Sequence, residues 1–440
     1  MSFASLGLSD ALVRAVAATG YTTPTPVQQQ AVPAVLEGRD LMVAAQTGTG
    51  KTAGFTLPLL QRLSEGTPAP ARQVRALVLT PTRELAAQVH DSIRAYATEL
   101  PLKSACIFGG VGANPQMKAI APGLDILVAC PGRLLDLVGQ KAVDLSQVEI
   151  LVLDEADRML DMGFIGDVRR VAKAVPADRQ TVLFSATMPK TISGLADELL
   201  TDPVRVEVTP EATTVERIDQ RVLFVAKDNK RALLNELMND DNIERAVIFT
   251  RTKHGADRVA KHLHQHGVKA DAIHGNKAQN ARQRALKGLR DGEIRALVAT
   301  DIAARGIDVD GVTHVINFDL PVDPESYVHR IGRTARAGAS GMAISFCDHD
   351  ERDSLRDIER CIRQPVPVFE EHPYHASEIA DLAEAPSGGK GRGGKGRGGR
   401  NGPRGGFRKS GPRPEGAGGR SGRPRRKGKG GPRRDAGIAA

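Results

Sequence analysis

LMVAAQTGTGKT, residues Leu41 to Thr52, carries the strongest structural signal in the chain. The apolar run Leu41–Ala45 predicts a buried strand, and Gly48 and Gly50 allow the backbone to turn sharply into a helix. In such a strand–loop–helix unit, the backbone N–H groups of the loop surround phosphate oxygens, and the N-terminus of the helix attracts negative charge. The stretch therefore predicts a nucleotide phosphate site in a parallel α/β sheet.

The last two side chains of this stretch have specific expected ligands. Lys51 should reach the β- and γ-phosphates, and the Thr52 hydroxyl should bind Mg²⁺. Ala45 stands where the general motif has its first glycine. A glycine turn before an ordinary helix is the alternative, and the preceding strand argues against it. The residues expected to contact the nucleotide here are Gln46, Thr47, Gly48, Thr49, Gly50, Lys51 and Thr52.

A second apolar run, Ile150–Leu153, ends in the acidic tetrad Asp154-Glu155-Ala156-Asp157. Carboxylates at the end of a strand can hold a metal ion and orient an attacking water. We assign Asp154 to Mg²⁺ and Glu155 to activation of the water. Alone, such a cluster could simply complement a helix dipole. Placed about a hundred residues after a phosphate loop, it predicts a hydrolysis site.

The second half of the chain contains HRIGRTARAG, His329 to Gly338. Arg333 and Arg336 are three residues apart and can share one face of a helical turn. Their planar guanidinium groups suit phosphate oxygens that gain charge in the transition state, where such arginines contribute roughly 10³–10⁵ in rate. A solvated basic helix face is the alternative. Together with the first-half motifs, the arginines predict a nucleotide bound from both halves.

Short apolar runs alternate with helical segments through most of the chain, which is typical of parallel α/β sheets. The segment VTPEATT, starting at Val208, has linker character. We therefore expect a first domain over residues 1–208, a linker over 209–216, a second domain over 217–370 and an extension with a tail over 371–440. The further predicted strands are Ala76–Thr80, Ile126–Ala129, Val182–Phe184, Ala246–Thr250, Ala296–Thr300, His314–Asn317 and Met342–Phe346.

The composition changes after Pro386. Residues 387–440 contain 17 lysines and arginines against two acids, a net charge of +15, so the first 386 residues carry −6 of the total of +9. The run SGGKGRGGKGRGGRNGPRGGF offers almost no side chains to bury, and we expect it to be disordered. Such a tail should bind RNA phosphates, with its arginines stacking on bases. A solubilising linker is the alternative.

Several classes of protein are disfavoured. No stretch approaches the roughly 20 apolar residues of a membrane span, and the N-terminal residues lack the pattern of a signal peptide. The four cysteines show neither paired metal spacing nor a disulfide framework. The composition therefore predicts a cytoplasmic protein.

The motifs resemble those of DEAD-box RNA helicases of superfamily 2 over residues 3–370, with longer runs similar to the bacterial RhlE-type subfamily. GYTTPTPVQ, ending at Gln28, resembles the family's adenine-reading motif. The resemblance implies that the Gln28 carboxamide reads adenine and that Phe3, upstream, is a candidate stacking aromatic. It also implies two tandem RecA-like domains, each with a parallel sheet.

The remaining motifs follow in the family's order. PTRELAAQ from Pro81, the Gly109–Gly110 pair and PGR from Pro131 resemble the RNA motifs of the first domain, and SAT resembles the element that couples hydrolysis to strand separation. Cys130 stands where the family commonly has threonine. By resemblance, Asp308 contacts the ribose of the nucleotide. The residues expected to bind RNA are Pro81, Thr82, Arg83, Gly109, Gly110, Pro131, Gly132, Arg133, Arg251 and Thr300, and those expected to couple the two activities are Ser185, Ala186, Thr187 and His329.

The resemblance implies an RNA-dependent ATPase that uses ATP and Mg²⁺, closes its two domains on RNA and separates short duplexes locally and non-processively. RNA contacts through phosphate and sugar carry little sequence information. The expected setting is ribosome assembly or RNA decay. An ATP-gated RNA clamp or annealing chaperone would use the same residues, and a duplex-unwinding assay separates the two. A DNA helicase on the same core is a further alternative, tested by comparing ATPase stimulation by RNA and DNA.

Overall fold

The computed structural model describes residues 2–46, 48–208, 218–304, 309, 311–335 and 341–384. Thr47, Asp308, Arg336, the expected linker and the basic tail lie outside the described residues. The described part forms two parallel α/β lobes, as the sequence predicts. No helix in the ranges given is long and apolar enough to cross a membrane.

The first lobe is built on a seven-stranded sheet in the order β3-β4-β2-β5-β6-β1-β7, in which every recorded pairing is parallel. The inner strands are apolar on both faces, as expected for a sheet covered on both sides. The strands are β1 (Leu41–Ala45), β2 (Val74–Leu79), β3 (Ser104–Ile107), β4 (Leu124–Ala129), β5 (Ile150–Leu153), β6 (Gln180–Ser185) and β7 (Val204–Val208).

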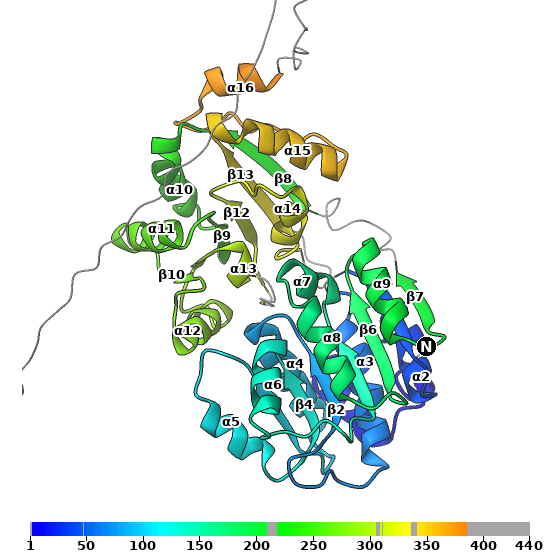
Figure 1. The fold of residues 1–440 in the computed structure, drawn as a ribbon. Coiled ribbons are helices and arrows are strands. Elements are labelled where there is room, and N and C mark those ends of the chain that lie inside the picture. Colours follow the sequence, from blue (N-terminus) through cyan, green and yellow to red (C-terminus); the bar gives the residue numbers. More distant parts are fainter. Residues whose placement is uncertain are drawn as a thin grey trace, which may run out of the picture. The chain divides into compact units, whose positions relative to one another are not determined.

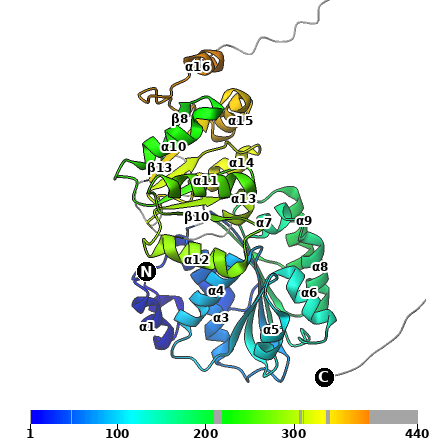
Figure 2. The same cartoon turned by 90° about the vertical axis from the view of Figure 1, so that its left-hand side faces the viewer.

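Helices cover both faces of this sheet, and each face has its own apolar core. Figure 2 shows α3 and α4 on one face and α6 and α8 on the other. The helices of the first lobe are α1 (Asp10–Ala18), α2 (Pro26–Leu36), α3 (Lys51–Ser64), α4 (Arg83–Tyr96), α5 (Ala113–Ile120), α6 (Pro131–Gly139), α7 (Ala156–Asp161), α8 (Ile165–Ala174) and α9 (Lys190–Leu199).

The second lobe has a six-stranded sheet in the order β10-β11-β9-β12-β13-β8, again with parallel pairings. Because inner strands such as β9 and β11 are fully buried, this sheet is also covered on both faces. The strands are β8 (Ile218–Phe224), β9 (Ala246–Phe249), β10 (Ala270–Ile273), β11 (Ala296–Ala299), β12 (His314–Asn317) and β13 (Gly341–Cys347).

In Figure 1, α10 and α11 lie on one side of this second sheet, and α14 and α15 lie on the other. The segment after α15 belongs to this lobe, because Val366 and Ile379 are buried against β8 and β13. The helices are α10 (Lys230–Met238), α11 (Lys253–Gln265), α12 (Gln279–Arg290), α13 (Asp301–Ala304), α14 (Pro324–Ile331), α15 (Arg352–Ile362) and α16 (Ser377–Glu384).

Candidate active site

The carboxyl ends of the first sheet divide into two groups of neighbouring loops. The adjacent strands β5, β6 and β1 lead into the acidic tetrad, Ser185–Thr187 and the phosphate loop. The adjacent strands β3, β4 and β2 lead into Gly109–Gly110, Arg133 and Arg83. Because parallel strands present their carboxyl ends at one edge, the strand order separates the predicted nucleotide residues from the predicted RNA residues.

The phosphate loop requires glycine at two positions. Gly48 and Gly50 have φ angles of 86° and 85°, a region that favours glycine. A β-carbon on Gly50 would also lie only 2.4 Å from Nε2 of Gln28. Lys51 is buried at the start of α3, and its Nζ donates a hydrogen bond of 2.9 Å to the carbonyl oxygen of Ala45. Its ammonium group is therefore held at the loop, where the sequence predicts the phosphates.

The remaining described residues of the loop are arranged around the same turn. The Thr49 hydroxyl donates to the carbonyl oxygen of Gln46 at 2.7 Å, which stabilises the turn from within. Thr52 is half-buried in the first turn of α3, directly after Lys51. A hydroxyl at this position comes directly after the backbone that is predicted to bind phosphate. The motif places its Mg²⁺ ligand at this position.

Gln28 ties α2 to the phosphate loop. Its side chain is almost fully buried; Oε1 accepts from the backbone N–H of Thr25 at 3.0 Å, and Nε2 donates to the carbonyl oxygen of Gly50 at 3.1 Å. Thr25 caps α2 and donates from its hydroxyl to the carbonyl oxygen of Thr49 at 2.8 Å. The carboxamide therefore supports the loop, and its role in reading adenine stays a prediction.

Phe3, the candidate stacking aromatic, is only 4% exposed and packs in the apolar core of the first lobe. A stacked base needs an open ring face, and this placement leaves little of one. Its role in adenine binding stays a prediction.

Asp154 is buried at the carboxyl end of β5. Burial first, and the neighbouring charge of Glu155 second, raise the pKa of Asp154 to about 7, while the charge of Lys51 acts in the opposite direction. A buried carboxylate with a raised pKa is stabilised in its charged form when a cation binds beside it. Mg²⁺ fits here, because it is commonly held by one or two carboxylates plus substrate phosphates. Within the described ranges, no group of three or more His, Cys, Asp or Glu side chains forms a metal cage.

The last acid of the tetrad binds the coupling element. Oδ2 of Asp157 accepts hydrogen bonds from the backbone N–H groups of Ala186 (3.1 Å) and Thr187 (2.9 Å), and from the Thr187 hydroxyl (3.1 Å). In return, the Ser185 hydroxyl accepts from the backbone N–H of Asp157 at 3.2 Å. The loop of the acidic tetrad and the Ser185–Thr187 loop are thus joined by hydrogen bonds, as their predicted coupling requires.

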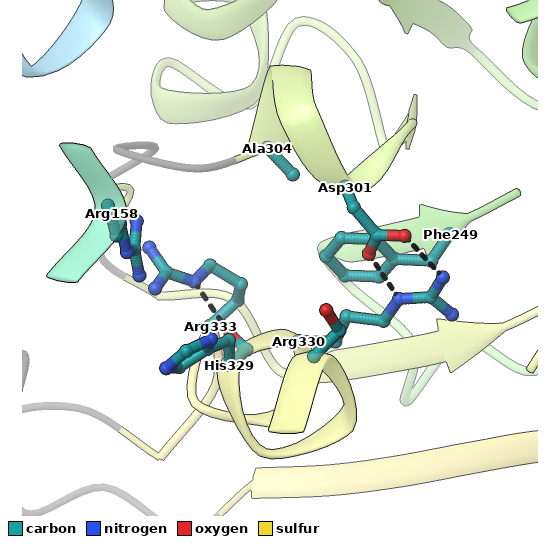
Figure 3. A pocket seen from close by; sticks show the side chains of 8 residues that line it. Arg158, Phe249, Asp301, Ala304, His329, Arg330 and Arg333 are labelled. Atoms are coloured by element: carbon teal, nitrogen blue, oxygen red, sulfur yellow. Dashed lines mark hydrogen bonds and ion pairs between the residues drawn. The ribbon is translucent and has the colours of Figure 1, made fainter. Parts of the chain in front are cut away.

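Residues of both lobes line one cavity of about 110 Å³. Gln46 and Thr187 come from the first lobe, and His329 and Arg333 come from α14 and the turn after it. Arg333 is buried, and Figure 3 shows it beside His329, whose carbonyl oxygen accepts from its Nε at 3.1 Å. The cavity therefore brings the phosphate loop, the coupling element and the second-half motif together.

The RNA motifs of the first lobe contact one another. Arg83 lies against the Gly109–Gly110 pair so closely that a β-carbon on Gly110 would lie 2.0 Å from its Nη1, and Gly110 has a φ of 79°. Arg133 donates from Nη2 to the carbonyl oxygen of Val111 at 3.1 Å. Thr82 caps α4, and Pro131 and Gly132 begin α6. These contacts place Arg83 and Arg133 against the same loop after β3.

The two RNA candidates of the second lobe follow inner strands. Arg251 comes after β9, and its side chain is 47% exposed although Nη2 donates to Oε1 of Glu351 at 3.0 Å. Thr300 lies between β11 and α13, and its carbonyl oxygen accepts from the N–H groups of Ala303 and Ala304, both at 2.9 Å. Arg251 is therefore oriented by a buried carboxylate while part of its guanidinium faces solvent.

Comparisons with known proteins identify the family to which this chain belongs. The DEAD/DEAH box helicase family matches residues 25–195, and the helicase conserved C-terminal domain matches residues 229–338. DEAD-box ATP-dependent RNA helicase CshA of Bacillus subtilis is 42% identical over 371 residues, which are 84% of this chain and 74% of the relative. The chain belongs to the DEAD-box RNA helicases. It is an ATP-dependent RNA helicase and thus an ATP hydrolase that binds RNA.

Other relatives and solved structures agree. RNA helicase CrhR of Synechocystis is 42% identical over 368 residues, which are 83% of this chain and 74% of that protein. Saccharomyces cerevisiae Dbp5 bound to RNA and ADP BeF3 is similar with a TM-score of 0.75 at 30% identity, over 87% of this chain and 98% of that one. The two-lobed RecA-like fold is confirmed, whereas the RhlE-type subfamily stays a prediction.

Sequence reasoning missed two features of this DEAD-box site. Arg330, in the same motif as Arg333, is buried and bound by Asp301 with bonds of 2.5 and 2.8 Å (Figure 3), so it supports the lobe. A cluster between the lobes joins Glu84 to Arg282 at 2.9 Å and to Gln279 at 3.0 Å. Glu84 lies inside the predicted RNA motif PTRELAAQ, but nothing local in the sequence indicates its partners.

Proposed function

We propose that this helicase unwinds short RNA duplexes locally and non-processively by ATP-driven closure of its two lobes, residues 1–208 and 217–370, and hydrolyses ATP to ADP and phosphate. The observation that carries the proposal is the cavity lined by Gln46 and Thr187 from one lobe and by His329 and Arg333 from the other. A nucleotide bound there contacts both lobes. Its binding energy is therefore available to hold them together.

The proposed chemistry assigns one task to each group. Glu155 takes a proton from the attacking water, and Lys51 binds the β- and γ-phosphates. Arg333, with Arg336, neutralises charge that develops in the transition state. Mg²⁺, held through Thr52 and Asp154, would shield the phosphate charges. Gln28 and Asp308 would contact the base and the ribose.

RNA would bind along the loops after β2, β3 and β4 and after β9 and β11. The side chains there are Arg83, Arg133, Arg251 and Thr300, with the glycine pair supplying backbone. Such groups recognise phosphate and sugar, so we expect little sequence preference. Because each stacked step costs on the order of 1.4 kcal/mol to disrupt, one closure can open only a few pairs.

The basic tail would supply long-range attraction for RNA, since residues 387–440 carry +15 and the rest of the chain carries −6. Each neutralised phosphate of a single strand contributes roughly −0.7 to the slope of log K against log salt. If the tail engages about five phosphates, its deletion should flatten that slope by about 3.5 and leave the RNA-saturated ATPase rate intact. An unchanged slope would assign the tail to another task.

The test of the main proposal measures strand separation and ATPase rate together. A short and a long RNA duplex of related sequence are offered to the full chain with ATP, with a non-hydrolysable analogue and with ADP, and the ATPase rate is measured with single-stranded RNA and DNA. We expect ATP-dependent separation of the short duplex only, and stimulation by RNA well above that by DNA.

Three results would contradict the proposal. RNA-stimulated hydrolysis without any strand separation would indicate an ATP-gated clamp or annealing chaperone. Equal separation of the long duplex would indicate processive movement. Stimulation by DNA equal to that by RNA would indicate a less selective helicase. Crosslinking to RNA in cells would then show whether ribosomal precursors or decaying RNAs are the natural partners.

A further inference from the structure

Arg158 directly follows the acidic tetrad, and the motif assignments give it no role. It lies in α7 with a side chain only 3% exposed, and its Nη1 is 3.3 Å from Oε2 of Glu155. Ion pairs three residues apart on a helix usually lie at the surface, where they contribute little. This one is buried, and charges interact more strongly there. The position of the Glu155 carboxylate therefore depends on Arg158.

The two nearest atoms of the Arg158–Glu155 ion pair are not joined by a hydrogen bond. Among the residues that the structure describes, neither Nη1 of Arg158 nor Oε2 of Glu155 has a hydrogen-bond partner. Arg330, in the same pocket, is fully engaged: it makes two bonds to Asp301 and one of 2.6 Å to the carbonyl oxygen of Asp319. Buried polar atoms are rarely left this way without a reason. The Arg158–Glu155 pair is therefore held by charge attraction. Its two nearest atoms can still form hydrogen bonds to a bound ligand or water.

A second guanidinium faces this pair from the other lobe. Arg158 and Arg333 line the same small cavity, and Figure 3 shows their side chains pointing toward one another. Burial first and the charge of Arg158 second lower the pKa of Arg333 to about 9, while Glu155 acts in the opposite direction. Two buried guanidinium groups thus face each other beside the Glu155 carboxylate, and an anion between them would lower their mutual repulsion.

We propose that Arg158 is a positioning residue for hydrolysis, whose buried charge holds the Glu155 carboxylate in place. The inference rests on the proposed role of Glu155 as the group that activates water. If Arg158 lost its charge, the buried Glu155 carboxylate would lose the counter-charge that lies 3.3 Å from its Oε2. Its position relative to the attacking water would then no longer be fixed.

The proposal leaves the atom balance of hydrolysis unchanged. The water oxygen forms a bond to the γ-phosphorus, the bond from that phosphorus to the bridging oxygen breaks, and ADP leaves with the bridging oxygen. The proton of the water goes to the Glu155 carboxylate. Arg158 gains and loses no proton, so its contribution is electrostatic and geometric.

The experiment compares Arg158→Gln, Arg158→Lys and Arg170→Gln in the full chain. Arg170 is a matched control, because it forms an i,i+3 pair with Asp167 at 2.9 Å in the same lobe but is 65% exposed. We expect Arg158→Gln to lower the RNA-saturated kcat about tenfold or more, since small misplacements of a reacting group are costly. KM for ATP should stay within about twofold, and Arg158→Lys should recover most of the rate.

Each outcome is informative once Glu155→Gln has been measured beside these variants. Loss of activity in Glu155→Gln with a wild-type rate in Arg158→Gln would overturn the inference and leave the proposed function standing. Activity in Glu155→Gln would overturn the role of Glu155 itself. Equal losses in the Lys and Gln variants would show that packing matters and not charge. A raised RNA-free rate in Arg158→Gln would make Arg158 an inhibitory latch, which also overturns positioning.

Discussion

Within the described ranges, two of the places where residues of the lobes meet differ in how their charges are paired. In the paired cluster, Glu84 of the first lobe binds Arg282 at 2.9 Å and Gln279 at 3.0 Å in the second lobe. In the arginine pocket, the Glu155 carboxylate lies 3.3 Å from Arg158 of its own lobe, and its charge also acts on Arg333 of the other lobe. The first place joins the lobes by short contacts between opposite groups, whereas the second brings two guanidinium groups close together.

Because of this difference, one place is suited to holding the lobes together and the other to responding to a bound phosphate. A buried ion pair with good geometry favours one arrangement of its partners strongly, because separating them leaves charges uncompensated. In the arginine pocket, two guanidinium groups face each other, and an anion bound between them would lower their repulsion. The paired cluster is therefore suited to keeping the lobes in register, and the arginine pocket to making their contact depend on a phosphate.

The largest expected effect comes from the arginine pocket. Glu155→Gln removes the carboxylate that accepts the water proton, and general-base catalysis typically contributes 10²–10⁴ in rate. We expect RNA-stimulated hydrolysis to fall by about that factor while ATP and RNA still bind. Steady-state ATPase rates and nucleotide titrations check this. Turnover close to that of the wild type would show that another group activates the water.

An intermediate effect is expected from the paired cluster. Glu84→Gln keeps the shape of the side chain but leaves Arg282 buried without its counter-charge whenever the lobes are in contact. The half-saturating RNA concentration should rise about tenfold, equivalent to roughly 1.4 kcal/mol, while kcat at saturating RNA changes little. RNA titrations of the ATPase rate measure both quantities.

Glu99→Gln is the matched control for this prediction. Glu99 also binds an arginine, Arg14, at 2.6 Å, but both side chains are exposed and belong to one lobe. Exposed pairs contribute little, so no change is expected. If Glu84→Gln behaved like the control, the paired cluster would not contribute to lobe contact. If it lowered kcat as strongly as Glu155→Gln, the two places would not be separable.

The sequence predicted the inner strands of both sheets and none of the edges. All nine predicted strands exist within two residues of their expected bounds, and the described strands that were not predicted are the edge strands β3, β7, β8 and β10. An inner strand such as β5 is apolar on both faces and stands out in the sequence. An edge strand such as β7, VRVEV, alternates apolar and charged residues because one face meets water.

The site shows the same limit at the level of side chains. Motif spacing indicated the phosphate loop, the acidic tetrad and Arg333, because these chemistries need particular residues in sequence order. It did not indicate the partners of Glu84, since Gln279 lies 195 residues further along the chain. Nor did it separate Arg330, which binds Asp301, from Arg333, which lies beside Arg158. Pairings of this kind depend on the packed fold.

The smallest expected effect concerns a contact that belongs to neither meeting place. Gln28 lies within the first lobe, where its carboxamide joins the backbone N–H of Thr25 to the carbonyl oxygen of Gly50. Gln28→Ala removes both bonds and the group proposed to read adenine. Since one hydrogen bond contributes about 1 kcal/mol, we expect KM for ATP to rise and the preference for ATP over GTP to fall, each by about fivefold.

Gln29→Ala provides the control, because Gln29 also donates to a backbone carbonyl, that of Pro24 at 2.8 Å, and Pro24 lies outside the phosphate loop. It should leave nucleotide preference unchanged. Gln28→Glu separates the two tasks of Gln28: a carboxylate still accepts from Thr25 but cannot donate to Gly50. If Gln28→Ala raised KM equally for ATP and GTP, the residue would support the loop without reading the base. Neither Gln28 variant should shift the RNA concentration dependence that Glu84→Gln changes, since Gln28 makes its recorded contacts within one lobe.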